Sequence, residues 1–539
     1  MATAAVSQVA GIPASRPLDN KWLVAASISF GAIMATIDLS IINVALPQIR
    51  GSIGASLDEI TAIATSYAIA QVVVMPLTAF LGRFFGQKRV YLICLGLFLI
   101  GSALCGMARS LSTLVMARIF QGFGAGALQP SQQAILRQTF PPREQGMAMA
   151  MVGMAVMIGP ALGPTLGSWI VDNYSWPWIF FINLPIGVVG MLMVSRFVHE
   201  PADIRAANHA SAERMRKNMD WAGIALMSVG LATLQYVLQE GNRNDWFQSR
   251  EIFISTVLAV TSIVGFVIIE LRAPAPAVLL RLFKDAIFSS STIIGGVMFA
   301  VMMASMFLLP VFMQELLGYT AFQSGLTLVP RTLVMMAMNP IVGRIYNHVS
   351  PRVIIALGVI LVAFGTLQMG AFTLATSTAG IISAQILQGI GFSCLFVPLV
   401  TLSLSHVPRP QLTDASGLNA VVRQFGGSAG LAIFANLLTT FAIQARGGLM
   451  AHVDMSRPEV TQRLGLITRG LMQRGMDPVS ARVGAVQALN GMVMRQAQVI
   501  AFEKTFILCG VLMLMLLPLT VFLKHRPHLE PSEVSHGET

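Results

Sequence analysis

Charged residues are scarce in this 539-residue sequence, where Asp, Glu, Lys and Arg together make up 11% of the chain. Soluble domains carry roughly a quarter of such residues. Apolar residues account for 55%, so a soluble globular protein is excluded. The net charge of +11 is spread along the chain rather than gathered in a compact basic domain, so nucleic acid is not expected as a partner.

Cysteine is also scarce, and its placement excludes redox and metal chemistry. Cys94, Cys105, Cys394 and Cys509 all fall inside apolar runs, and the sequence has no CxxC motif or Cys/His cluster. The eight His residues lie outside the middle of those runs. There is no phosphate-binding loop and no Ser/His/Asp set. We therefore expect no enzyme, no metal and no ATP-driven pump on this chain.

What the sequence does contain is a series of apolar runs of about 20 residues, each long enough to cross a bilayer as a helix. Their spacing predicts fourteen transmembrane helices and an all-α polytopic membrane protein. The first run is too long for a cleavable signal peptide. The short outside loops carry only four basic residues, Arg50, Arg109, Arg243 and Arg250, which predicts that both termini lie in the cytoplasm.

One acidic residue stands apart from the other Asp and Glu residues. Of the 24 in the chain, Asp38 alone lies well inside a predicted span, within Lys21 to Leu46. A carboxylate in hydrocarbon costs about 2.5–3.5 kcal/mol on insertion scales, so it usually faces a cavity or a partner. Asp38 is therefore a candidate functional residue, and proton binding is the chemistry that a lone buried carboxylate performs best.

The chain also resembles itself. Leu46-Pro47 recurs 263 residues later as Leu309-Pro310, and the segment from Arg118 to Gly124 recurs 267 residues later as Gln385 to Gly391. Such parallel repeats build many transporters, with the substrate path between the halves. Spans 221–239 and 252–270 then form an insertion between two six-helix halves. The predicted divisions are a tail 1–20, a bundle 21–200, inserted helices 201–285, a second bundle 286–524 and a tail 525–539.

These features make the chain resemble the major facilitator superfamily, and within it the fourteen-helix drug:proton antiporters of the EmrB/QacA type. The resemblance rests on residues 37–47, 118–124, 153–167 and 178–187. It implies a multi-pass protein of the bacterial cytoplasmic membrane that exports amphiphilic toxic compounds by alternating access. The driving force would be inward proton flow, with no cofactor beyond the proton gradient.

Asp38 and Arg118 are the predicted proton-coupling pair. Each lies about seven residues from the outer end of its span, and therefore about 10 Å below the outer boundary. In the family the first and fourth helices are neighbours. Separation of the pair would change how tightly Asp38 holds a proton. The alternative is a static ion pair in the cavity wall.

The fifth span contains a glycine stripe, Gly159, Gly163 and Gly167, with Pro160 and Pro164 between these glycines. The glycines permit close helix packing and the prolines favour a bend. The resemblance implies that this segment seals or hinges the interface between the halves. Tight packing alone is the alternative.

The loop Leu81 to Arg89 corresponds to a gating loop of the family. Gly86 and Lys88 keep the family pattern, but Arg83 occupies the usual acidic position and Phe84 the usual Arg position. We therefore favour a basic cluster that sets topology over a charge-relay gate.

Polar residues in or at the ends of spans predict the wall of a substrate cavity. They are Asn43, Gln121, Gln314, Arg331, Gln385, Gln388 and Arg423. No second deep carboxylate matches the two arginines, so a cavity that they face would be positive and would favour neutral or anionic amphiphiles. The 32 Met residues suit a cavity that repacks around varied ligands, although lipid-facing filler is the alternative for most of them.

Residues 442–501 form a long outside loop. Val460, Leu464 and Leu471 share one helical face, and Asp477-Pro478 is typical of the start of a second helix. The predicted helical hairpin lies on the membrane surface or docks another protein. The resemblance implies a periplasmic membrane-fusion adaptor and an outer-membrane channel as partners, beside small amphiphilic substrates, protons and lipids.

Two other functions stay open. One is a proton-coupled exporter of a single metabolite or siderophore, and the other is a membrane scaffold or sensor that transports nothing. The deep charges argue against a scaffold, which has no reason to retain their insertion cost.

Overall fold

The computed structural model describes residues 21–200, 220–273, 276–454 and 456–523. Within these ranges the chain is helical and contains no strand, as the sequence predicts. The two predicted tails and residues 201–219 of the predicted linker lie outside the described residues.

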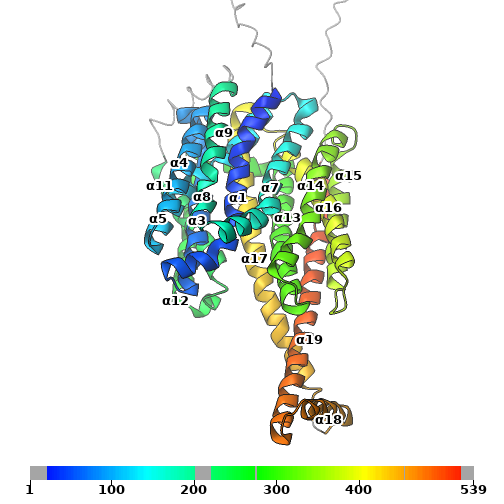
Figure 1. Ribbon diagram of the computed structural model, residues 1–539. Coiled ribbons are helices and arrows are strands. Elements are labelled where there is room, and N and C mark those ends of the chain that lie inside the picture. Colours follow the sequence, from blue (N-terminus) through cyan, green and yellow to red (C-terminus); the bar gives the residue numbers. More distant parts are fainter. Residues whose placement is uncertain (1–20, 201–219, 274–275, 455, 524–539) are drawn as a thin grey trace, which may run out of the picture.

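Residues 21–197 form the first helical bundle (Figure 1). Its helices are α1 (Lys21–Ile53), α2 (Leu57–Ile60), α3 (Ala62–Phe85), α4 (Gln87–Met107), α5 (Leu111–Gly126), α6 (Leu128–Thr139), α7 (Gln145–Asn173), α8 (Trp178–Phe181) and α9 (Asn183–Phe197). Two outer turns begin with capping boxes, Ser56 with Glu59 and Ser110 with Thr113, which satisfy backbone N–H groups that the helix leaves free.

The two inserted helices and the second bundle follow in the order of the chain. Their helices are α11 (Trp221–Glu240), α12 (Arg250–Arg272), α13 (Ala286–Val311), α14 (Ala321–Ile345), α15 (Pro351–Gly370), α16 (Thr378–Ser403), α17 (Leu412–Met450), α18 (Pro458–Gln473) and α19 (Pro478–Leu514). The starts of α13 and α14 are again capped, by Asp285 and by the Thr320–Gln323 box. A π-helical turn, Phe312–Leu316, extends α13 past Pro310.

Thirteen helical segments of the described chain are long and apolar enough to cross a membrane. The predicted span at 146–171 is not among them, although α7 covers it and packs along α1 and α14. The all-α fold with two bundles is confirmed, whereas the count of fourteen stays a prediction.

The two bundles meet mainly through α3 and α6 with α17, and through α7 with α14 and α16. At the cytoplasmic start of α7, Gly146 and Gly343 allow backbone contact, because a Cβ atom on Gly146 would lie 2.6 Å from the Gly343 carbonyl oxygen. A Cβ atom on Gly417 of α17 would likewise lie 2.9 Å from the Met75 carbonyl oxygen of α3. These contacts close the bundles against each other toward the cytoplasm.

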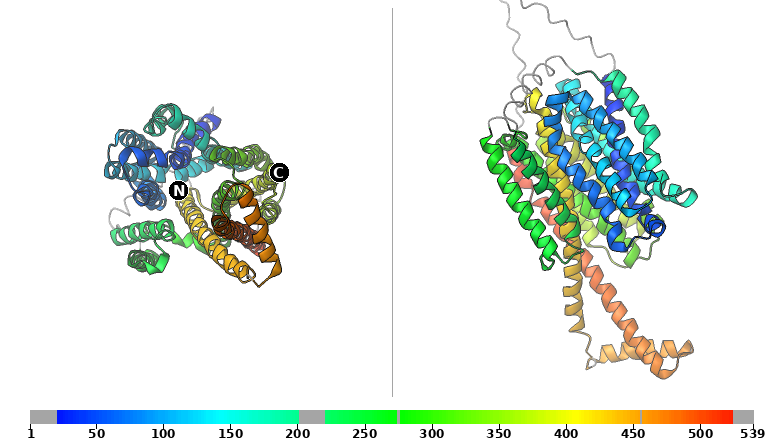
Figure 2. Two further views of the ribbon diagram at one scale, coloured as in Figure 1. Left: turned by 60° about the horizontal axis from the view of Figure 1, so that its bottom comes forward. Right: turned by 90° about the vertical axis from the view of Figure 1, so that its left-hand side faces the viewer.

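A helical extension projects from the opposite end (Figures 1 and 2). Arg495 donates to the carbonyl of Leu316 at the outer end of α13, and the part of α19 before Arg495 rises about 26 Å beyond that point at 1.5 Å per residue. The predicted start of α19 at Asp477-Pro478 is confirmed, and Asp477 accepts from the backbone of Val479 and Ser480.

The extension corrects one expectation about residues 442–501. α17 and α19 continue without a break out of the bundle, and α18 lies across their far end (Figure 1). The predicted loop is therefore not a separate hairpin, because its first and last parts are continuations of α17 and α19. The hydrophobic pattern alone could not show this, because α19 changes from an amphipathic helix to a uniformly apolar one without an end signal between them.

Candidate functional site

Asp38 and Arg118 form an ion pair in the interior of the first bundle. Asp38 lies on α1 and Arg118 on α5, and both side chains have 0% exposure. The Arg118 Nη1 to Asp38 Oδ2 distance is 2.5 Å. The predicted proximity of the two residues, deduced from their equal depth, is confirmed.

Two amides complete the surroundings of Asp38. Gln121 Nε2 donates to Asp38 Oδ1 at 2.9 Å, and its Oε1 accepts from Arg118 at 2.9 Å. Asn183, at the start of α9, donates to the same Oδ1 at 3.3 Å and to Ser102 Oγ at 3.0 Å. The carboxylate thus receives hydrogen bonds on both oxygens, one of them from the charged Arg118.

Arg118 is held from the other side by α3. Its Nε donates to the carbonyl of Ile63 at 3.2 Å, and its guanidinium lies 4.2 Å from the centre of the Tyr67 ring. The Tyr67 hydroxyl and the Arg118 Nη2 are buried without a partner in the described chain. Unsatisfied buried polar atoms are costly, so this centre has capacity for one more hydrogen-bonding group.

A second polar network lies in the other bundle. Arg331 of α14 donates to Gln388 of α16 at 3.4 Å, and Gln388 donates to Thr366 at 2.7 Å and to Ser305 at 3.4 Å. Gln385 donates to the Thr327 carbonyl at 2.8 Å. Three predicted cavity residues, Arg331, Gln385 and Gln388, are therefore buried on neighbouring helices. Gln121 instead belongs to the Asp38 centre.

Arg423 forms a third polar group on α17. Its Nη1 donates to Asn419 at 2.6 Å, and Asn419 donates to Ser403 at 2.8 Å. The guanidinium lies 5.7 Å from the Phe299 ring centre, within cation–π range. Arg423 is 3% exposed, so its charge is buried beside neutral groups.

One predicted cavity residue lies away from these networks, and the side chain of another is not described. Gln314 is exposed in the π-helical turn at the outer end of α13. Asn43 lies in α1, and its side chain is outside what the structure describes.

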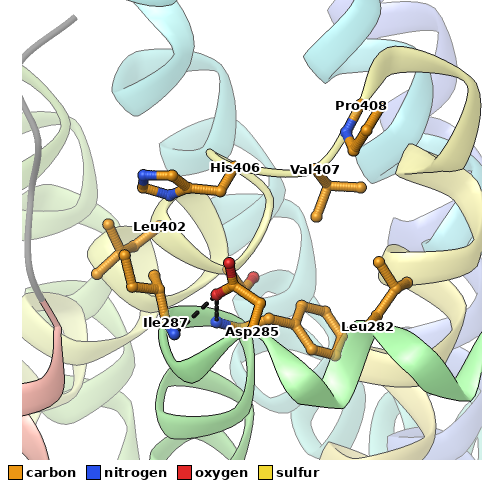
Figure 3. A pocket seen from close by; sticks show the side chains of 9 residues that line it. Leu282, Asp285, Ile287, Leu402, His406, Val407 and Pro408 are labelled. Carbon is orange, nitrogen blue, oxygen red and sulfur yellow. Dashed lines mark hydrogen bonds between the residues drawn. The ribbon is translucent and has the colours of Figure 1, made fainter.

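A small hollow lies at the cytoplasmic end of the second bundle (Figure 3). Its walls come from the short 3-10 helix η3 (Leu280–Lys284), the start of α13 and the end of α16 with the turn that follows it. The lining residues are Leu282, Asp285, Ile287, Phe288, Leu402, Ser403, His406, Val407 and Pro408. Asp285 accepts from the backbone of Ile287 and Phe288 at 2.8 Å and so caps α13 (Figure 3). None of the predicted cavity residues lines this hollow.

The loop between α3 and α4 does more than set topology. Arg83 Nη1 lies 3.1 Å from Asp414 Oδ2 of α17, an ion pair between the two bundles, and Gln87 donates to Thr413 beside it. A basic cluster that sets topology therefore describes only part of the role of this loop. Arg83 stands at the family's acidic position, and the opposite charge is supplied by α17.

Gly86 and Lys88 act within the first bundle. Gly86 has φ of +83°, which favours glycine, and a Cβ atom there would lie 2.7 Å from a carboxylate oxygen of Glu200. Lys88 donates to the carbonyl of Ser195 at 2.7 Å. The two residues fix the turn against the end of α9, which leaves Arg83 and Gln87 to contact the other bundle.

The glycine stripe of α7 packs against α1. A Cβ atom on Gly159 would collide with the Thr36 backbone, one on Gly163 with Ser40, and one on Gly167 would lie 2.7 Å from Ile41. The stripe therefore presses α7 against the helix that carries Asp38. Pro160 and Pro164 lie within continuous α7, and their side chains are outside what the structure describes.

Sequence reasoning missed three polar residues of these centres. Asn183 was visible as the single amide of the apolar segment 178–187, and its isolation could have marked it. Tyr67 gave no such signal. Asp414 lies in the first turn of α17, and only the packing of two bundles makes it 3% exposed.

The sequence matches a known protein family and several named relatives. The model of the Major Facilitator Superfamily matches residues 28–431. The chain is 35% identical over 421 residues to the multidrug export protein EmrB of Haemophilus influenzae, covering 78% of this chain and 80% of the relative. It is 33% identical to the fatty acid resistance protein FarB of Neisseria gonorrhoeae, covering 85% of this chain and 92% of the relative.

A solved structure shares the fold at low sequence identity. The crystal structure of the human organic anion transporter MFSD10 aligns with a TM-score of 0.59 and 15% identity, covering 92% of this chain and 99% of that one. The helical spans and these relatives make the chain a multi-pass protein of the bacterial inner membrane. The chain belongs to the Major Facilitator Superfamily, as a permease of the EmrB type.

Proposed function

We propose that this protein exports amphiphilic compounds in exchange for protons, with Asp38 as the proton-binding carboxylate. The observation that carries the proposal is the fully buried Asp38–Arg118 pair at 2.5 Å, to which Gln121 and Asn183 also donate. A carboxylate with these donors holds a proton weakly, and the same carboxylate without the cation holds it tightly in an apolar interior.

Exchange follows from making and breaking this pair. Arg83 and Asp414 join the cytoplasmic ends of the bundles, so in this state the proton would reach the buried Asp38 from outside. Movement of Arg118 away from Asp38 lets the carboxylate take up that proton. When the bundles reopen toward the cytoplasm, the pair re-forms and expels the proton inward. The proton gradient drives the cycle, and the different proton affinities of the two states couple it to the conformational change.

The decisive experiment replaces Asp38 by Asn, which keeps the shape and removes the titration. Purified wild type and D38N are reconstituted into proteoliposomes, and uptake of a fluorescent amphiphile is followed with and without an imposed proton gradient. The gradient should accelerate transport in the wild type and have no effect in D38N. The matched control is E315Q, because Glu315 is exposed. Gradient-driven transport by D38N would place the proton site elsewhere.

We also propose that neutral or anionic amphiphiles are preferred substrates. Arg331 and Arg423 are buried, and their hydrogen-bond partners Gln388 and Asn419 are neutral. An anionic group that reaches them would relieve two uncompensated positive charges. The name of FarB, a fatty acid resistance protein, is compatible with this preference. Competition between an anionic and a cationic dye tests it, and faster export of the cation would refute it.

The helical extension is the proposed docking site for a periplasmic adaptor, which would lead to an outer-membrane channel. It projects away from the bundle and exposes Val479, Val483 and Val486 on one side of α19. Replacing these three residues by Ser should abolish export from intact cells and leave transport in proteoliposomes unchanged. Equal loss in both assays would mean that the extension serves the transport step itself.

A further inference from the structure

Two carboxyl groups meet at the cytoplasmic ends of the inserted helices. Asp220 caps α11, and its Oδ1 accepts from the Gly223 N–H at 2.7 Å. Glu270, in the last turn of α12, is 3% exposed, and its Oε1 accepts from the Val278 N–H at 2.6 Å. The remaining oxygens, Asp220 Oδ2 and Glu270 Oε2, are buried, and no N–H group of the described chain reaches them.

These two oxygens face each other. Both lie beside Gly223, where a Cβ atom would be 3.0 Å from Glu270 Oε2 and closer still to Asp220 Oδ2. Two carboxylates beside the same glycine repel each other when both are ionised, and one shared proton removes that repulsion. We propose that Asp220 and Glu270 form a second proton-binding site, which stabilises the closed cytoplasmic contact between the bundles.

The connection to that contact runs through the segment after α12. Glu270 accepts a hydrogen bond from the N–H of Val278. The carbonyl of the preceding residue, Ala277, accepts from Arg83 Nη2 at 3.0 Å. Arg83 Nη1 is paired with Asp414. Glu270 therefore anchors the residues that help to orient Arg83 toward α17.

The charged groups around the pair define its response to pH. The charged residue nearest to Glu270 on α11 is Asp220. On the other side of residues 277–278 lies Arg83 of α3, which is paired with Asp414 of α17. The nearby cations of α12 and η3 are exposed: Arg272, Arg281 and Lys284. Because the proposed pair needs one bound proton, its stabilisation of the contact is present at low pH. It is lost as the pH rises and both groups ionise.

This inference rests on the alternating access of the proposed function and not on the role of Asp38. Its test is a distance measurement on the full chain in lipid nanodiscs, without substrate or gradient. Spin labels are placed at Phe85→Cys and Pro410→Cys, on the cytoplasmic ends flanking the contact, in a background without the native cysteines. The distance distribution is recorded at about pH 5.5 and about pH 8.5, on either side of the range in which a shared carboxyl proton would dissociate.

In the wild type, the distribution should move to longer distances by a few ångströms as the pH rises. Glu270→Gln should keep the short distance at both pH values, because the amide can donate to Asp220 permanently. Asp220→Asn should do the same and retains a good helix cap, so it guards against misfolding of the first variant. E315Q should respond like the wild type.

Three outcomes would overturn the proposal. They are a wild-type distance that does not change with pH, a pH response that survives both Glu270→Gln and Asp220→Asn, and a response abolished by D38N but by neither of these. If D38N loses gradient-driven transport while its pH-dependent distance change persists, the two proton sites are separate, as proposed.

Discussion

Gln121 and Gln388 occupy equivalent positions of the internal repeat, 267 residues apart, and both have 0% exposure. Gln121 donates to Asp38, whereas Gln388 donates to Ser305 and Thr366. Ser305 stands 267 residues after Asp38, so a hydroxyl takes the place of the carboxylate. The two bundles share a scaffold of hydrogen bonds, but only the first contains a group at this position that can exchange a proton.

The arginines show the same difference. Arg118 has an ion pair, a backbone carbonyl and an aromatic ring around it. For Arg331 the hydrogen-bond partner in the structure is the neutral Gln388, at 3.4 Å. A neutralised charge suits a proton switch, and an uncompensated one suits the recognition of an anion. The comparison supports our proposals that the first bundle binds the proton and that the second recognises the charge of the substrate.

The strongest test moves the carboxylate from one bundle to the other. The double variant Asp38→Asn/Ser305→Asp places the acid beside Gln388 and Arg331. We expect gradient-driven transport in proteoliposomes to stay at the uncoupled background, because the second bundle lacks an equivalent of the Arg118 cage. Restored coupling would show that the bundles are interchangeable for proton transfer.

A smaller effect is expected when the two arginines are replaced by Met. Arg118→Met leaves Asp38 buried without its cation and should destabilise the protein by about 3–5 kcal/mol where Asp38 stays ionised. Arg331→Met leaves only a neutral amide short of a partner, a loss of about 1–3 kcal/mol. Thermal unfolding in one detergent ranks the variants, with Glu315→Gln as the surface control. Equal losses would contradict the difference in pairing.

The smallest difference in stability between the two bundles is expected when the two glutamines are replaced. Gln121→Ala and Gln388→Ala should each destabilise by about 1–3 kcal/mol, because buried partners lose a hydrogen bond. Only Gln121→Ala should also change the pH dependence of transport, since Gln121 touches the titrating carboxylate. The pH profile of dye efflux checks this. A changed profile in Gln388→Ala would extend proton coupling to the second bundle.

Much of the first bundle could be predicted from the sequence, because its chemistry follows from single residues in strongly apolar runs. Equal depth along two helices, which the family resemblance implied to be neighbours, predicted that Asp38 and Arg118 lie close together. The repeat predicted two bundles, and the Asp477-Pro478 cap predicted where α19 begins. These inferences use helix rise, hydropathy and capping, which are local properties of the chain.

The contacts between bundles could not be predicted in the same way. Asp414 and Glu270 lie in terminal turns, where an acidic residue normally faces water, and each is buried by helices distant in sequence. The predicted common cavity also combined residues from separate networks, because depth within a helix does not tell which side of it faces which neighbour.

The length of α17 has a consequence for communication across the membrane. It is one continuous helix of 39 residues, about 58 Å long at 1.5 Å per residue. It carries Asp414 at its cytoplasmic start, Arg423 further along and part of the projecting extension at its end. One helix thus joins the projecting extension directly to the Arg83–Asp414 ion pair. A partner that bound the outer end of α17 would therefore contact the same helix that holds the two bundles together at the cytoplasmic side.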